Sequence, residues 1–170
     1  MSVFTPNLYL HRITDVTPEL LRLNRIRGLI LDVDNTLTHH GSQEVTQKVL
    51  DWLQTMREHG IQMMIASNNS ERRIRPFAQK LGLDYLSMSC KPMTFAFTRA
   101  CRKFGLETRE TALIGDQIYT DILGGNLKGL FTILVEPFEM EDGFLLRCKR
   151  RMEQKHLRGL SPRRKGGKRP

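Results

Sequence analysis

The sequence predicts an α/β fold of three layers, with one parallel sheet between helices on both of its faces. Short apolar runs of strand length alternate along the chain with longer stretches of amphipathic, helical spacing. The central runs are apolar at nearly every position, which is typical of strands buried on both faces. Acidic and other polar residues follow directly after most runs, where parallel α/β sheets bind their ligands.

Five strands are predicted, and right-handed crossovers between them make the sheet parallel. They are expected at residues 29–34, 61–66, 84–88, 111–115 and 130–135. The run at 84–88 is the weakest of these, because it is short and contains polar residues. Residues 1–27 are interpreted as a lead-in that holds one short helix and adds no strand to the sheet.

Helices are predicted between the strands and near the N-terminus. Thr17-Pro18-Glu19 supplies a capping hydroxyl, a proline for the first helical position and an acid for the first turn, so a helix is expected to begin there. The others are expected at 43–59, 71–81, 91–104, 117–127 and 142–157. Gly124-Gly125 is expected to break the helix at 117–127 and to allow close packing.

The length of 170 residues predicts one domain, here placed at 1–157 with the basic helix included. Residues 158–170 are polar and basic and cannot form a core, so they are expected to be a disordered tail. No apolar stretch has the length of a membrane span, and the N-terminus lacks the pattern of a signal peptide. The expectation is a cytoplasmic protein, with peripheral membrane attachment as an option.

The positive charge is concentrated near the C-terminus. Residues 147–170 contain eleven Lys or Arg and one Glu, a net charge of +10, whereas the preceding 146 residues carry 16 bases and 17 acids. Such an excess predicts a polyanionic partner, either RNA or an anionic membrane surface. The alternative is a docked terminal helix followed by a solubilising tail.

The first predicted strand ends in Asp32 and Asp34, with Thr36 two residues further on. Residues two apart in a strand point the same way, so both carboxylates are expected to converge at the carboxyl edge of the sheet. Two close carboxylates repel each other, which predicts a divalent cation, proton chemistry or both. The structural alternative is a turn, rich in Asp and Asn, that closes the strand.

Polar residues at the other strand ends extend this site. They are Ser67 and Asn68 after the second strand, Lys91 after the third, and Asp116 and Asp121 after the fourth. Carboxylate oxygens suit a hard cation such as Mg²⁺, and a lysine suits the oxygens of a phosphoryl group. The pattern predicts a metal-dependent phosphate site at the carboxyl edge of the sheet.

Four motifs resemble, in order and spacing, those of phosphatases of the haloacid dehalogenase (HAD) superfamily. They are Asp32-Val33-Asp34-Asn35-Thr36, Ser67, Lys91, and Gly115-Asp116 with Asp121. Across residues 4–157 the chain is similar to the small subfamily IIIA phosphatases of the YqeG type, supported by Ile65-Ala66-Ser67-Asn68-Asn69, Cys90-Lys91-Pro92 and Asp142-Gly143-Phe144. The resemblance implies a Rossmann-like fold and Mg²⁺-dependent hydrolysis of phosphate monoesters.

The resemblance also implies roles for individual residues. Asp32 would attack phosphorus to form an aspartyl-phosphate, and Asp34 would protonate the leaving oxygen and then activate water. The residues implied to bind the phosphoryl oxygens are Thr36, Ser67 and Lys91, with Asn68 as a further candidate. The groups implied to hold Mg²⁺ are Asp32, the Asp34 backbone carbonyl and Asp116. Asp121 would support the metal shell or Lys91. For Asn68 and Asn69, capping of the next helix is an equal alternative.

The spacing of the motifs leaves no room for the lid domain found in many members of this superfamily. Between Thr38 and Gln43 only a small flap fits, and the stretch from Ser67 to Lys91 is used up by one helix and one strand. An open site would accept a bulky substrate, such as a protein, a nucleic-acid end or a lipid headgroup, or be covered by a second subunit. His39 and His40 either contact the leaving group or lie in a solvated loop.

Two functions of different classes follow from these features. The first is a phosphatase, for which phosphatidylglycerophosphate is one substrate known among related subfamily IIIA proteins. The second is an RNA- or ribosome-associated binding protein that keeps a vestigial phosphatase site and acts through its basic tail. The complete set of motif residues favours the enzyme. Arg72, Arg73 and Arg75 are interpreted as a solvated helix face.

Overall fold

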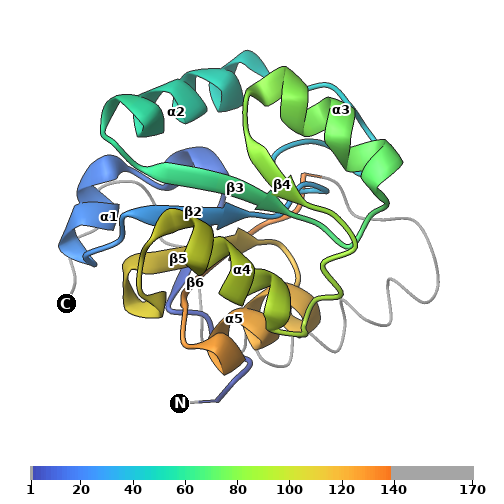
Figure 1. Ribbon diagram of the computed structural model, residues 1–170. Coiled ribbons are helices and arrows are strands. Elements are labelled where there is room, and N and C mark those ends of the chain that lie inside the picture. Colours follow the sequence, from blue (N-terminus) through green and yellow to red (C-terminus); the bar gives the residue numbers. More distant parts are fainter. Residues whose placement is uncertain (1, 139–170) are drawn as a thin grey trace.

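A computed structural model describes residues 2–138 of the chain, and Figure 1 shows the arrangement. Within these residues, six parallel strands form one sheet in the order β1-β6-β5-β2-β3-β4. The strands are β1 (Leu8–Leu10), β2 (Gly28–Leu31), β3 (Gln62–Ala66), β4 (Asp84–Leu86), β5 (Thr111–Gly115) and β6 (Phe131–Val135). The parallel α/β fold is therefore confirmed. The helix predicted at 142–157 and the tail at 158–170 lie outside the described residues.

The helices lie close to the predicted positions. They are α1 (Pro18–Leu23), α2 (Gln47–Glu58), α3 (Glu71–Leu81), α4 (Phe95–Phe104) and α5 (Leu123–Lys128). Single turns of tighter or wider helix occur at η1 (Ile13–Asp15), η2 (Thr108–Glu110) and η3 (Ile118–Ile122), the last of which is π-helical. The first residues of two helices were predicted four positions too early. The helix predicted at 43–59 begins at Gln47, and the one predicted at 91–104 begins at Phe95.

Two predictions about the sheet and its helices are wrong. The count of five strands missed β1, which forms an edge by pairing with β6. The predicted break at Gly124-Gly125 is also absent, since α5 runs through both glycines. These glycines allow close packing instead: a Cβ on Gly124 would lie 2.9 Å from the Phe97 ring, and one on Gly125 would lie 2.5 Å from Thr132.

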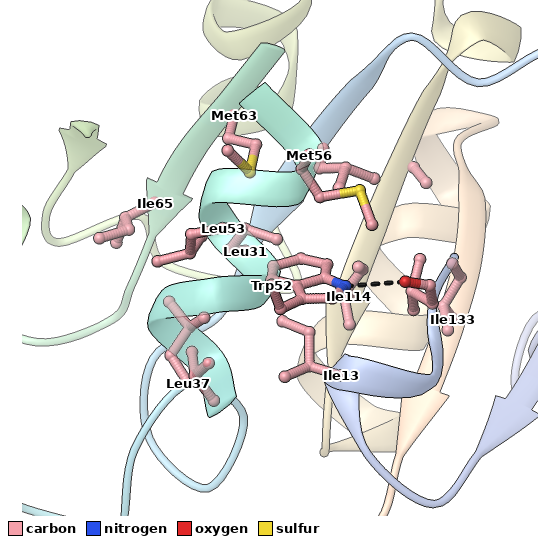
Figure 2. Packing of buried hydrophobic residues seen from close by; sticks show 14 of the residues in the cluster. Ile13, Leu31, Leu37, Trp52, Leu53, Met56, Met63, Ile65, Ile114 and Ile133 are labelled. Carbon is pink, nitrogen blue, oxygen red and sulfur yellow. Dashed lines mark hydrogen bonds between the residues drawn. The ribbon is translucent and has the colours of Figure 1, made fainter. Parts of the chain in front are cut away.

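The alternation of side chains along the strands divides the core between the two faces of the sheet. Leu29 and Leu31 of β2 pack in the larger cluster with residues of α2 and α3, whereas Ile30 faces the cluster beneath α4. Figure 1 shows α2 and α3 on one face and α4 and α5 on the other. In the larger cluster, the Trp52 indole donates a hydrogen bond of 2.7 Å to the Val16 carbonyl (Figure 2).

The register brings the polar strand ends together. Leu31 of β2 lies between Ile65 of β3 and Ile114 of β5, so the three strands finish at almost the same level. Asp32 follows β2 directly and donates its backbone N–H to the Ile114 carbonyl at 2.9 Å. Among residues 2–138, no helix has the length and apolar character needed to cross a bilayer.

Candidate active site

Asp32 lies buried where β2 ends, beside the side chain of Lys91. The Lys91 ammonium is 2.5 Å from one Asp32 carboxylate oxygen and 2.7 Å from Asp121. The Lys91 side chain is 2% exposed. Burial alone would lower the pKa of Lys91, but the carboxylates of Asp121 and Asp32 outweigh burial and raise it. Lys91 is therefore a fixed positive charge between two carboxylates.

Asn68 holds the backbone of Lys91 in place. Its amide oxygen accepts hydrogen bonds from the Lys91 N–H at 2.7 Å and from the Ser89 hydroxyl at 3.1 Å, and its amide group donates to the Lys91 carbonyl at 3.2 Å. The N-cap residue of α3 is Ser70. The capping alternative for Asn68 and Asn69 is thus wrong, because Asn68 bonds to the Lys91 backbone and Asn69 to Asp34 and Ser67. Contact of Asn68 with a phosphate stays a prediction.

Three carboxylates form a cluster that could hold a metal ion. Oxygen atoms of Asp32, Asp116 and Asp121 lie within 4.8 Å of one another, and all three residues are buried. A Cβ on Gly115 would lie 2.4 Å from the Asp121 carboxyl group, so the glycine permits this approach. An all-oxygen donor set of this charge fits Mg²⁺. The sequence prediction named Asp116 as a ligand and Asp121 as its support, whereas the structure brings both carboxylates to the cluster.

Asp34 lies apart from this cluster and is held by hydrogen-bond donors. Asn69 donates to one carboxylate oxygen at 2.6 Å, and the other accepts from Arg73 at 2.5 Å and from the Gly41 N–H at 2.9 Å. The His40 ring nitrogen is 3.7 Å from the same oxygen. The Asp34 side chain is 11% exposed, as is that of Asp32, so both carboxylates are largely buried at this edge of the sheet.

Arg73 is the site residue that the sequence interpretation missed, since it was assigned to a solvated helix face. Arg72 and Arg75 are exposed as expected, but Arg73 is only partly so and pairs with Asp34. The available signal was its position four residues before the buried Phe77, which puts Arg73 at the edge of the inner face of α3. Gln43 also donates to the Arg73 carbonyl at 3.2 Å.

The two hydroxyl residues predicted to bind phosphate are both buried at this edge. Ser67 accepts hydrogen bonds from the Asn69 N–H at 3.2 Å and from the Asn69 side chain at 3.3 Å. The Thr36 hydroxyl has no hydrogen-bond partner among the residues that the structure describes. A buried hydroxyl normally has a partner, so this position suits a ligand or a water molecule. Of the two histidines, His40 is close to Asp34, whereas the His39 ring packs 5.1 Å from that of Phe138.

The described residues contain no lid over the site. Residues 39–46, between the first motif and α2, hold neither helix nor strand. The stretch from β3 to Lys91 contains only α3 and β4 before the loop that carries the lysine. Within residues 2–138, no further domain is inserted at either position.

Asp32 gives the metal-free protein a pH-dependent stability. Burial, reinforced by the Asp121 carboxylate and only partly offset by Lys91, raises the pKa of Asp32 from 3.8 to about 7. The folded chain then holds a proton that the unfolded chain has released, so stability falls as the pH rises from about 4 to about 7. The whole effect amounts to about 4 kcal/mol at most.

We expect Asp32→Asn to remove this dependence when a chelator is present. The amide of the variant resembles the protonated, neutral Asp32. The free energy of unfolding of Asp32→Asn in urea should therefore match that of the wild type at about pH 4 and exceed it at about pH 8. Parallel pH profiles for the two proteins would contradict the assignment of the raised pKa to Asp32.

A parallel sheet whose carboxyl edge gathers an aspartate pair, a buried lysine and a carboxylate cluster defines the class of haloacid dehalogenase-like hydrolases. The family model described by that name matches residues 29–91, and a HAD-hydrolase-like model matches residues 89–137. The chain is 41% identical over 163 residues to the probable phosphatase YqeG of Bacillus subtilis, covering 96% of this chain and 94% of the relative. It therefore belongs to the YqeG-type phosphatases of this superfamily, which are phosphoric monoester hydrolases.

Two further similarities are more distant. The chain is 26% identical over 159 residues to phosphatidylglycerophosphate phosphatase 1 of Arabidopsis thaliana. This alignment covers 85% of this chain and 46% of the plant protein. The cobalt-bound deoxy-D-mannose-octulosonate 8-phosphate phosphatase of Haemophilus influenzae superposes with a TM-score of 0.55 at 16% identity, covering 81% of this chain and 90% of that one. The second similarity supports the fold alone.

Proposed function

We propose that this phosphatase is Mg²⁺-dependent and forms an aspartyl-phosphate on Asp32, with phosphatidylglycerophosphate as its candidate substrate. One observation carries the proposal: Asp32 is buried within 2.5 Å of the Lys91 ammonium and within 4.8 Å of two further carboxylates. A carboxylate in this position has a cation to orient it and a second cation site to relieve the surrounding negative charge.

The residues that would hold Mg²⁺ are Asp32, Asp116 and the Asp34 backbone carbonyl, with the Asp121 carboxylate beside them. When bound, the metal supplies positive charge to the phosphoryl oxygens and to the carboxylate cluster. Asp121 also contacts Lys91 at 2.7 Å, so it orients the lysine. Lys91, Thr36, Ser67 and, as a further candidate, Asn68 would contact the phosphoryl oxygens.

In the first step, a carboxylate oxygen of Asp32 attacks phosphorus and the bond to the leaving oxygen breaks. A proton from Asp34 passes to that oxygen, so the product leaves as an alcohol. Asn69 and Arg73 support this role, because they hold the Asp34 carboxyl group in a fixed position two residues after Asp32.

In the second step, water attacks the phosphorus of the aspartyl-phosphate. Asp34 takes a proton from that water, the bond between phosphorus and Asp32 breaks, and inorganic phosphate leaves. Lys91 remains beside Asp32 throughout and stabilises the negative charge of the transferring group. The side chains that begin the cycle are thereby restored.

Two observations support a bulky or lipid substrate. The first is the site without a lid among the described residues, and the second is the similarity to a plant phosphatidylglycerophosphate phosphatase. A cytoplasmic location with peripheral attachment to an anionic membrane suits such a substrate. The basic segment predicted to bind a membrane or RNA lies outside the described residues.

The test is phosphate release from phosphatidylglycerophosphate in mixed micelles, beside a panel of soluble phosphate esters, with Mg²⁺ and with a chelator. We expect turnover of the lipid that stops when the metal is removed. Turnover of soluble esters alone would contradict the lipid substrate. An absence of release from every ester, with Mg²⁺ bound and the fold intact, would favour the binding-protein alternative.

A further inference from the structure

We propose that the loop between β4 and α4 docks onto an anionic phospholipid surface and thereby presents phosphorylated headgroups to Lys91. The proposal deepens the proposed function and rests on it, because it assigns the surface by which an enzyme with a lipid substrate meets the membrane. It is carried by exposed apolar side chains in the segment that also holds Lys91.

Exposed apolar side chains are concentrated in this loop and at Phe95, the first residue of α4, which is counted with the loop from here on. Met88 is 58% exposed, Met93 is 61% exposed and Phe95 is 48% exposed. The other exposed large apolar residues of the described chain are scattered over separate segments, and they are Val3, Leu23 and Leu127. Single exposed apolar residues are ordinary, but three within eight positions mark an interaction surface.

These side chains flank, along the chain, the residue that would bind the phosphate. All three lie within four positions of Lys91, so their Cα atoms are at most about 14 Å from it. Lys91 is directed into the molecule, where its side chain is 2% exposed, whereas the two methionines and Phe95 extend to solvent. A headgroup at Lys91 would therefore have its acyl chains within reach of these exposed apolar side chains.

The loop is held in this shape by its backbone. Met88 and Cys90 both have positive φ angles, of 47° and 51°, which residues other than glycine rarely adopt. The Met88 N–H donates to the Asn69 carbonyl at 2.9 Å, and the Met93 N–H donates to the Cys90 carbonyl at 2.9 Å. The exposed positions are thus part of a fixed turn that also carries the lysine.

Basic side chains on the flanking helices select an anionic surface. Arg72 and Arg75 on α3 and Arg99 on α4 are all exposed. Arg99 follows Phe95 by one turn and so shares its side of the helix. None of these arginines forms an ion pair with another residue of 2–138. Exposed apolar side chains, together with cations that form no ion pair among residues 2–138, suit anionic phospholipid.

The test introduces a reporter into the loop of the full chain. Phe95→Trp adds an exposed indole, while Trp52, the one native tryptophan, is buried. We expect its emission to shift to shorter wavelength with vesicles of phosphatidylcholine and phosphatidylglycerol, and brominated acyl chains to quench it. Vesicles of phosphatidylcholine alone should have little effect. An emission unchanged by anionic vesicles would overturn the proposal.

A double variant and a matched control measure how much the loop contributes to vesicle binding. Met93→Ser with Phe95→Ser should weaken binding to anionic vesicles by about tenfold, because two half-exposed apolar side chains no longer leave water. Leu23→Ser, on α1 and 69% exposed, is the matched control and should leave binding unchanged. Equal binding by the wild type and the double variant would refute docking through the loop. A wild-type dimer that the double variant loses would also refute it, in favour of self-association.

Vesicle binding is measured without any turnover of substrate. The phosphatase function and the docking of the loop can therefore be refuted independently of each other. Phe95→Trp and the double variant Met93→Ser, Phe95→Ser should both hydrolyse soluble esters at the wild-type rate, since every residue assigned to the phosphatase site is unchanged in them. An inactive protein whose indole is quenched would remove the proposed function and leave the docking surface. An active protein whose indole is not quenched would leave the proposed function and remove the docking surface.

Discussion

Asp32→Asn is expected to reduce phosphate release on the order of 10⁴-fold or more, since it removes the attacking group. The amide is nearly the same size as the carboxylate and can still accept a hydrogen bond from Lys91. The fold should therefore persist, and the far-ultraviolet circular dichroism should be unchanged. The measurement is Mg²⁺-dependent phosphate release under saturating substrate.

Asp51→Asn, on the exposed face of α2, is the matched control for this change. It alters the same chemical group far from the strand ends and should leave the rate unchanged. A rate for Asp32→Asn within tenfold of the wild type would exclude Asp32 as the nucleophile. In that case, mass spectrometry of trapped phosphoprotein would identify the residue that carries the phosphoryl group.

Lys91→Met is expected to affect both stability and activity. The change leaves the Asp32 and Asp121 carboxylates buried without their cation, and removal of one member of a buried ion pair costs about 3–5 kcal/mol. Phosphate release should fall by about 10²–10³-fold, since a charge that stabilises the transition state is lost. Urea unfolding with a chelator measures the first effect.

Mg²⁺ should restore part of the stability lost in Lys91→Met, because a cation in the carboxylate cluster replaces some of the missing charge. Lys103→Met is the control: this lysine pairs with Asp84 at 3.0 Å, but its side chain is 56% exposed. We expect a change of less than about 1 kcal/mol there, as for other surface pairs. Equal losses for the two lysines would refute the special position of Lys91.

The sequence carried enough information for the layered fold and for most of the residues that gather at its carboxyl edge. Periodic apolar runs and their polar ends located five strands, and the register of β2, β3 and β5 brings Asp32, Ser67 and Asp116 to one edge. These predictions succeed because a buried parallel strand must be apolar throughout and its end must face the ligand edge.

The remaining features depend on contacts between distant segments. β1 has only three residues, and its partner β6 lies more than a hundred positions away, so no local pattern marks it. The contact of Arg73 with Asp34 likewise joins a helix to a strand end, and a solvated arginine has the same local sequence. The π-helical turn that carries Asp121 also has no distinct periodicity in five residues.

The pairing of β1 with β6 also has a consequence for biosynthesis. Leu8 lies beside Ile133 in the sheet, and Asn7 exchanges hydrogen bonds with Thr132, across 125 residues of chain. A nascent polypeptide releases β1 early, but within the described sheet its partner strand is among the last to emerge from the ribosome. Long-range pairings of this kind form slowly. At this edge of the sheet, therefore, the first strand to be translated has no partner until β6 has been made.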